Sequence, residues 1–283
     1  MRICIQIYMG NFDQKTISGF GDEWARFTQD ELKGDLLQKI YNDYFSIFPW
    51  ELLPSDAEGI DVGCGSGRWA QLVAPRVRLL HLVDASKEAL DVARQNLRGH
   101  GNVDFYQARV DKMPFDDNSM DFAYSLGVLH HLPDTDAAIR SVVAKIKPGA
   151  PILIYLYYAF DNRPVWYRYL WRVSNTLRFF ISRLPYFFRY VVSQLIACVI
   201  YWPLSRFAYL FEKFSVNVLN WPLCYYRDKS FYVMRTDALD RFGTQLEKRF
   251  TRAEITSMLE KAGLIKIIFS GHSPYWCVVG IKG

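Results

Sequence analysis

The chain has 283 residues, of which 51% are hydrophobic, 16% aromatic and 22% charged. These values exclude a disordered chain and a membrane protein with many spans, and the length allows one domain with a long insertion. The formal net charge is +5, yet residues 163–213 carry +7 by themselves, which leaves the rest of the chain slightly acidic. A basic excess confined to one segment indicates a local anionic or membrane-facing surface, and no nucleic-acid partner is expected.

The cysteines are few and widely spaced: Cys4, Cys64, Cys198, Cys224 and Cys277. With an odd count and no CxxC pair, they favour a reduced protein without a metal site. The N-terminus also lacks the apolar run and the small-residue cleavage site of a secretory signal. We therefore expect a cytoplasmic location.

Along the chain, a helical region comes first, in residues 1–57, where apolar residues recur at helical spacing. Strands and helices then alternate through residues 58–158, and the expected strands are 59–62, 79–83, 103–106, 122–126 and 151–157. The alternation stops in residues 159–250. It resumes in residues 251–283 with a Thr251–Glu254 capping box, a helix and strands at 264–269 and 275–281. Such alternation predicts an α/β fold around a parallel sheet with right-handed crossovers.

A glycine-rich loop follows the first predicted strand, with the sequence Asp61-Val-Gly63-Cys64-Gly65-Ser-Gly67. Glycines let the backbone turn tightly and approach a ligand, and the acidic residue ahead of them suits a cationic ammonium or sulfonium group. The alternative is a dinucleotide site, which uses a GxGxxG spacing and bare helix N–H groups for a pyrophosphate. The GxGxG spacing favours the cationic ligand.

An acidic residue, Asp84, ends the second predicted strand, 21 residues after Gly63. A carboxylate at this place accepts hydrogen bonds from both hydroxyls of a ribose. Its alternative role is to cap the next helix, a role for which Ser86 competes. Because the loop and the acidic residue occur together, we favour ribose binding by Asp84.

The loop is one of five motifs that point to a known family. The five are Gly59–Gly67, Leu82–Ser86, Met113–Asp121, Val128–Asp134 and Lys147–Gly149. In these motifs, and in the final helix and strands, the chain resembles class I S-adenosylmethionine-dependent methyltransferases, in particular the ubiquinone/menaquinone-biosynthesis group. The resemblance implies a doubly wound, mostly parallel sheet of seven strands in the order 3-2-1-4-5-7-6, with strand 7 antiparallel. Residues 1–57 then form a lid, 58–158 the cofactor-binding core, 159–250 a helical insert after strand 5, and 251–283 the end of the core.

The same resemblance implies S-adenosylmethionine as the cofactor, lying over the carboxyl ends of strands 1, 2 and 4. The residues implied to surround it are Asp61, Gly63, Cys64, Gly65, Gly67, Asp84, Ala85, Val110, Asp111, Met113 and Leu126. One position departs from the family, because many relatives carry an acidic residue five positions before Pro114, where this chain has Arg109. Arginine has no acceptor for the adenine amino group. We expect Asp111 or a backbone carbonyl to accept that hydrogen bond.

Two adjacent histidines, His130 and His131, follow the fourth predicted strand. Methyl transfer from a sulfonium depends mainly on in-line positioning, and a hydroxyl acceptor also needs a base. His131 is the first candidate for this base and His130 the second, since related proteins often carry histidine at the position of His131. The alternative for His131 is a structural role before the helix that starts at Asp134.

The insert contains the clearest amphipathic pattern, in residues 166–184, where apolar residues share one helical face. The opposite face carries Arg168, Arg172, Arg178 and Arg183. A charge-free run of 16 residues follows at 190–205; it is interrupted by Pro203 and shorter than the ~20 residues that span a bilayer. Two interpretations remain: a helix lying in a membrane interface, or a substrate lid whose apolar face packs on the core or on a second subunit.

Together these features predict a methyltransferase for a small hydrophobic or lipid-linked acceptor, in the cytoplasm or peripherally bound to an anionic membrane. A tailoring enzyme for a soluble sugar or natural product is one alternative. A non-catalytic partner protein that keeps the fold is another, and Arg109 is the feature that motivates it.

Overall fold

The computed structural model describes residues 10–26 and 34–283. In these residues seven strands form a sheet in the order β3-β2-β1-β4-β5-β7-β6. Neighbouring strands are parallel, except that β7 runs antiparallel to β5 and β6. The doubly wound fold predicted from the sequence is therefore confirmed. The strands are β1 (Glu58–Val62), β2 (Leu79–Asp84), β3 (Val103–Gln107), β4 (Phe122–Leu126), β5 (Pro151–Tyr155), β6 (Leu264–Phe269) and β7 (Cys277–Lys282).

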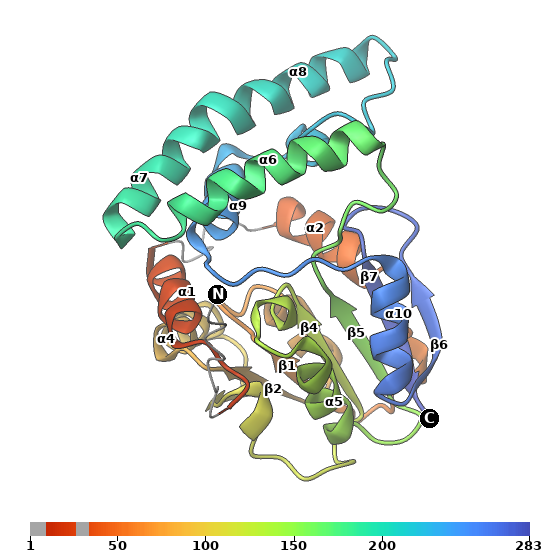
Figure 1. Cartoon of the computed structure of the whole chain (residues 1–283). Helices are drawn as coiled ribbons and strands as arrows, with labels where there is room; N and C mark the ends of the chain where they lie inside the picture. The colour runs from red at the N-terminus through yellow and green to blue at the C-terminus, as the bar shows by residue number, and fades with distance from the viewer. Residues whose placement is uncertain (1–9, 27–33) are drawn as a thin grey trace, which may run out of the picture.

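Helices cover both faces of the sheet and the edge at which the parallel strands end (Figure 1). The N-terminal and core helices are α1 (Gln14–Arg26), α2 (Asp35–Phe45), α3 (Ala70–Val73), α4 (Lys87–Asn96), α5 (Thr135–Lys145) and α10 (Arg252–Lys261). The helices of the insert are α6 (Val165–Ile181), α7 (Tyr186–Ile196), α8 (Trp202–Lys213) and α9 (Phe231–Gly243). The insert forms a layer of its own above the sheet, and α7 and α8 lie farthest from the strands.

The core has two parts, one on each face of the sheet, because side chains alternate along every strand. On one face, Phe122 and Tyr124 pack with α2, α3 and α4, and the ring of Phe45 lies 5.4 Å from that of Tyr124. On the other face, Ala123 packs with the buried sides of α5 and α10. Gly59 lies opposite Phe122, where a Cβ atom would come within 2.2 Å of the Phe122 ring, so only glycine allows this packing.

Side-chain caps start the core helices where the sequence predicts them. The hydroxyl of Ser86 accepts a hydrogen bond from the N–H of Ala89, and the Asp134 carboxylate does the same for α5. Thr251 and Glu254 form the predicted capping box of α10. After the glycine loop, α3 has four residues, and a 3-10 turn follows it at Pro75. One predicted length is wrong. The fifth strand was expected to reach residue 157, but β5 ends at residue 155.

The outer helix of the insert differs from expectation. A π-helical turn at Ala197–Tyr201 joins α7 to α8, which gives one helix of 28 residues, Tyr186–Lys213. The prediction of a short run broken at Pro203 is wrong, because the wider turn shifts the hydrogen-bond pattern just before the proline and accommodates its ring. Within the described ranges, this is the one helix whose length and composition would suffice to cross a membrane.

The orientation of α6 also differs from expectation. The sequence places Arg178 on an exposed basic face, but only 7% of this residue is exposed. Its guanidinium donates hydrogen bonds to the carbonyls of Thr244 (2.8 Å) and Gln245 (3.3 Å) in the segment after α9. Part of the polar side of α6, at Arg178 and Ser182, therefore faces the body of the protein, where unpaired carbonyls need donors, while Arg168, Arg172 and Arg183 stay exposed.

Candidate active site

A cavity of about 670 Å³ lies between the sheet and the insert in the part of the chain that the structure describes. Its inner end is formed by the glycine loop and by residues at the ends of β2 and β4. Its outer end lies inside the insert and is mainly aromatic, with Tyr157, Tyr158, Phe160, Tyr167, Trp171 and Tyr225 among the lining residues. One continuous space thus joins the predicted cofactor loop to the predicted substrate side.

The glycine loop bends over the end of β2. The N–H groups of Gly63 and Cys64 donate hydrogen bonds to the carbonyl of Val83, at 2.7 and 3.1 Å. Gly63 and Gly65 have φ angles of 76° and 53°, values that residues with a Cβ atom rarely adopt. Gly63, Cys64 and Gly65 all line the cavity, as the sequence predicts for a loop that approaches a ligand.

The carboxylate of Asp84 lies beside this loop and also lines the cavity. It accepts hydrogen bonds from the N–H groups of Gly65 (3.0 Å) and Ser86 (2.9 Å). Burial raises its pKa, and these backbone hydrogen bonds oppose that effect. Because Ser86 caps α4, Asp84 is not needed as a cap. A carboxylate has about four acceptor positions, so two remain for the hydroxyls of a ribose.

Two residues of the motif lie behind the loop and do not line the cavity. Only 2% of Asp61 is exposed, and its carboxyl accepts a hydrogen bond from the hydroxyl of Tyr124 at 2.9 Å. Burial raises the pKa of Asp61 to about 8. Gly67 packs against α4, where an added Cβ atom would come within 2.9 Å of Leu97. The structure thus places Asp61 and Gly67 as supports of the loop.

The segment after β3 contributes Val110 and Arg109 to the cavity. The guanidinium of Arg109 binds both carboxylate oxygens of Asp111, each at 3.0 Å, and lies 4.2 Å from the ring centre of Phe12. Asp111 does not line the cavity, and Met113 is buried in the core. The expected role of Asp111 as an acceptor for adenine is therefore not supported, because its side chain pairs with Arg109 and does not line the cavity.

The remaining predicted cofactor residues, Ala85 and Leu126, line the cavity at the ends of β2 and β4. The N-terminal helix α1 closes this end from above. Phe20 and Trp24, four residues apart on α1, both line the cavity, and Trp24 lies against the open face of Gly65. Of the predicted lid in residues 1–57, residues 1–9 and 27–33 lie outside the described residues.

The two histidines occupy different environments. His131 lines the cavity, and its Nδ1–H donates a hydrogen bond of 2.7 Å to the carbonyl of Leu246. In a neutral ring the lone pair is then on Nε2, which lies 3.9 Å from a carboxylate oxygen of Asp240. His130 is fully buried outside the cavity lining, with its ring 3.9 Å from that of Tyr157. Burial holds the pKa of His130 well below its usual value.

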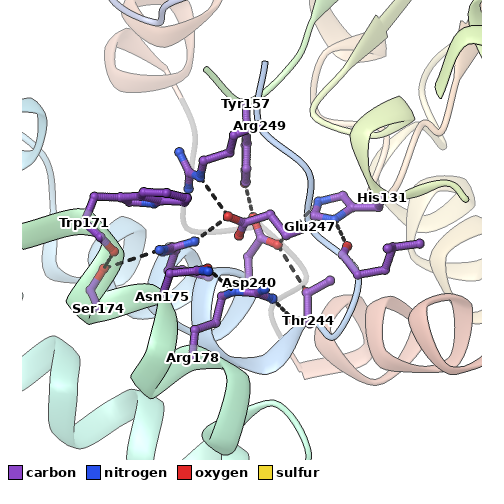
Figure 2. Close-up of polar contacts among 12 residues, drawn as sticks. His131, Tyr157, Trp171, Ser174, Asn175, Arg178, Asp240, Thr244, Glu247 and Arg249 are labelled. Carbon is purple, nitrogen blue, oxygen red and sulfur yellow. Dashed lines mark hydrogen bonds and ion pairs between the residues drawn. The ribbon is translucent and has the colours of Figure 1, made fainter. Parts of the chain in front are cut away.

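A buried polar network surrounds His131 (Figure 2). The hydroxyl of Tyr157 donates a hydrogen bond to the carboxylate of Asp240. Glu247, whose side chain is 1% exposed, forms ion pairs with Arg241 and with Arg249 (2.8 Å). Burial alone would raise the pKa of Glu247, but the neighbouring arginines outweigh it, so the pKa is lowered. Glu247 is therefore a carboxylate that holds two arginines beside the cavity.

Comparison with known proteins agrees with this geometry. Residues 60–154 match a family profile described as a methyltransferase domain. The chain is 33% identical over 102 residues to the methyltransferase YcgJ of Bacillus subtilis, a match covering 35% of this chain and 40% of that protein. It is 28% identical over 168 residues to the ubiquinone/menaquinone biosynthesis C-methyltransferase UbiE of Idiomarina loihiensis, covering 52% of this chain and 67% of that protein.

The chain spans only 40% to 47% of the length of several curated relatives that it matches. Among solved structures, it aligns with a chain of the complex between the Haloferax volcanii Trm112 methyltransferase activator and its methyltransferase partner. That alignment has a TM-score of 0.53 and 14% identity, and covers 93% of this chain and 97% of the other. At this identity the likeness concerns the fold alone.

The profile match covers the residues that form the glycine loop, Asp84 and the first five strands. Residues 60–154 are thus a methyltransferase domain of the class I, S-adenosylmethionine-dependent kind. The methyltransferase domain is thus built from β1–β5 and completed by α10, β6 and β7, while the insert from Val165 to Gly243 supplies the outer half of the cavity.

Sequence reasoning missed the polar residues that this methyltransferase places opposite the cofactor loop. Tyr157 follows β5, and Asp237 and Asp240 lie on α9. One signal could have found the α9 residues. Asp237, Asp240 and Arg241 recur at helical spacing between the apolar residues Met234, Ala238 and Phe242, so charged groups share a helix with a buried face. Burial raises the pKa of Asp237 to about 6.

Proposed function

We propose that this chain transfers a methyl group from S-adenosylmethionine to a small hydrophobic or lipid-linked acceptor. The continuous cavity carries the proposal, because it joins Asp84 and the glycine loop to a chamber lined largely by aromatic and aliphatic side chains. A chamber of this kind binds apolar molecules and uses a few polar groups to orient them. His131, Asp240 and Tyr157 are among the polar groups that line it.

The residues at the inner end fit the cofactor. Asp84 has acceptor positions left for the ribose, and the backbone of Gly63 and Gly65, which lines the cavity with positive φ angles, would face the amino-acid portion. When bound there, S-adenosylmethionine supplies an activated methyl group. Val110 and Leu126 would contact its apolar parts, and α1 would exclude water through Phe20 and Trp24.

We assign the base to Nε2 of His131. If the acceptor is a hydroxyl, this nitrogen would take its proton, while the bound cofactor would supply the methyl group by breaking its sulfonium C–S bond and would leave as the neutral thioether. The imidazolium so formed keeps its Nδ1–H on the carbonyl of Leu246 and is stabilised by the nearby carboxylate of Asp240. Tyr157 holds that carboxylate in place through its own hydrogen bond. The protein therefore orients the acceptor and receives one proton.

The test is a methyl-transfer assay with isotope-labelled donor on a lipid extract and on the soluble extract of the same cells. Labelled product in the lipid extract is expected. His131→Gln should lower turnover by ~10²-fold while cofactor affinity stays nearly unchanged, whereas the exposed His272→Gln should have no effect. Product in the soluble extract alone would favour the tailoring enzyme for a soluble acceptor.

Calorimetry tests the cofactor site separately. Asp84→Ala should weaken binding of S-adenosylmethionine at least tenfold, since it removes hydrogen bonds to a charged group worth ~1.5–3 kcal/mol each. The matched control is Asp91→Ala, an exposed carboxylate on α4. No binding by the wild-type chain would contradict the assignment and favour a non-catalytic partner protein.

A further inference from the structure

The outer helix of the insert has inverted polarity. The positions that it buries against the rest of the protein are mostly small: Ser193, Ala197, Tyr201, Ser205 and Ala208. On the outside, Leu195 is 58% exposed and Val199 is 69% exposed. Only 17% of the most apolar window of this helix is buried. A helix in water buries its large apolar residues, whereas a helix in lipid presents them to the hydrocarbon and packs through small ones.

The neighbouring helix α6 also exposes large apolar residues, although its Tyr167 and Trp171 line the cavity. Arg178 and Ser182 face inward and are buried, while Trp166 is 52% exposed and Phe180 is 64% exposed. Both helices thus expose large apolar side chains, and both belong to the layer that the insert forms above the sheet in Figure 1. We call these side chains the outer apolar face, represented by Trp166, Phe180, Leu195 and Val199. Exposed apolar areas of this extent mark a contact site.

The cavity reaches this face. Leu170, Val173 and Leu177 of α6 line the cavity and are also 46%, 46% and 55% exposed. Across from them, Ile200 and Leu204 of the outer helix line it as well and are 45% and 37% exposed. Residues that are both lining and exposed define an opening, so an apolar passage leads between α6 and the outer helix into the cavity.

We propose that the outer apolar face inserts into one leaflet of an anionic bilayer, so that the passage opens into lipid. A lipid-linked acceptor then reaches His131 laterally without crossing water. The lateral entry of the acceptor rests on the proposed function, whereas the insertion of the outer apolar face into the bilayer does not. Exposed basic residues complement the lipid headgroups, since Arg168, Arg172 and Arg183 adjoin the face and residues 163–213 carry +7.

Charge and packing favour this occupant over the alternatives. A symmetric second copy would bring two strongly basic segments together, which like-charge repulsion opposes. If the outer helix crossed the bilayer fully, α9 would enter the bilayer too. Helix α9 packs along α7, and its Met234 and Ala238 are buried against Ala197 and Tyr201 of the outer helix. Since α9 also holds Asp237, Asp240 and Arg241, its transfer into hydrocarbon is unfavourable.

Vesicle sedimentation tests the insertion. The full chain should pellet with vesicles of equal parts phosphatidylcholine and phosphatidylglycerol at low salt, and less with phosphatidylcholine alone. A triple variant, Phe180→Gln, Leu195→Gln and Val199→Gln, should reduce the bound fraction at least tenfold. Its matched control is Leu52→Gln, Ile265→Gln and Ile268→Gln, three apolar side chains of similar exposure outside the insert, and this control should bind like the wild type. Circular dichroism establishes that both variants are folded.

Several outcomes would overturn the inference. One is a wild-type chain that stays in the supernatant with anionic vesicles at low salt. Another is a stable dimer that the Phe180–Leu195–Val199 variant dissociates, which would assign the face to a second copy. A third is protease access to the chain from both sides of the vesicle, which would indicate spanning. The triple variant should keep wild-type affinity for S-adenosylmethionine, so loss of vesicle binding is separable from failure of the cofactor site.

Discussion

The sheet and the two helices α6 and Tyr186–Lys213 of the insert bury different kinds of residue. In the sheet, Phe122 and Tyr124 are fully buried and the helices turn their apolar sides inward. In the outer helices of the insert, Arg178 and Ser193 are buried while Phe180 is 64% exposed. Both regions have regular amphipathic patterns. The difference teaches that such a pattern identifies which residues share a face, whereas the medium around that face determines which way it points.

The largest expected effect sharpens this comparison directly. Phe122→Ala should lower the free energy of unfolding by ~3–5 kcal/mol, because it leaves a cavity in a fully packed core. The same truncation at Phe180 should change it by less than ~0.5 kcal/mol, since most of that ring is already exposed. Denaturant unfolding in the absence of lipid measures both. A large loss at Phe180 would mean that this surface is a packed interface in solution.

A second pair of substitutions tests the polar interior of the insert. Arg178→Ala should cost ~1–3 kcal/mol, because the carbonyls of Thr244 and Gln245 then lose their buried donor. Arg172→Ala, an exposed arginine on the same helix, should cost almost nothing. Thermal unfolding of the two variants side by side gives the difference. Equal small effects would contradict the inward orientation of Arg178.

The smallest effect concerns Asp61, a buried carboxyl group in the otherwise apolar strand β1. Burial raises the pKa of Asp61 to about 8 from an ordinary value of 3.8. Between these values the folded chain holds a proton that the unfolded chain has released, so stability falls as pH rises. Each pH unit in this window should remove up to about 1.4 kcal/mol. Asp61→Asn should flatten that slope, while Asp91→Asn at an exposed site should leave it unchanged, as unfolding at pH 6 and 7 would show.

For the core, local signals were sufficient. The strands of the parallel sheet, the caps at Ser86, Asp134 and Thr251, and the turn of the glycine loop were predictable in this way, whereas the strand order came from the resemblance to class I methyltransferases. Each depends on neighbours a few residues away or on a periodic pattern, so the sequence alone carries the information. The placement of Gly63, Gly65 and Asp84 at one cavity follows, because the carboxyl ends of parallel strands share an edge of the sheet.

The candidate site was predictable only in part. His131 is close to a predicted motif, but Tyr157, Asp240 and Glu247 come from segments more than 20 residues away. They meet only because the chain after α9 returns beside β5, where the N–H of Phe250 bonds to the carbonyl of Tyr157. Likewise, an acidic residue near Pro114 was available as an acceptor in the sequence, and only the structure shows Asp111 paired with Arg109.

The sequence by itself determined the methyltransferase core of this protein, because periodicity, capping and glycine conformation act over short distances along the chain. The tertiary structure decided the direction in which α6 and the outer helix face, and hence what the insert can contact. A side-chain pattern does not say which of its two faces points inward. That is settled only when the segment after α9 offers carbonyls to Arg178 and α9 itself offers a close surface to Ala197.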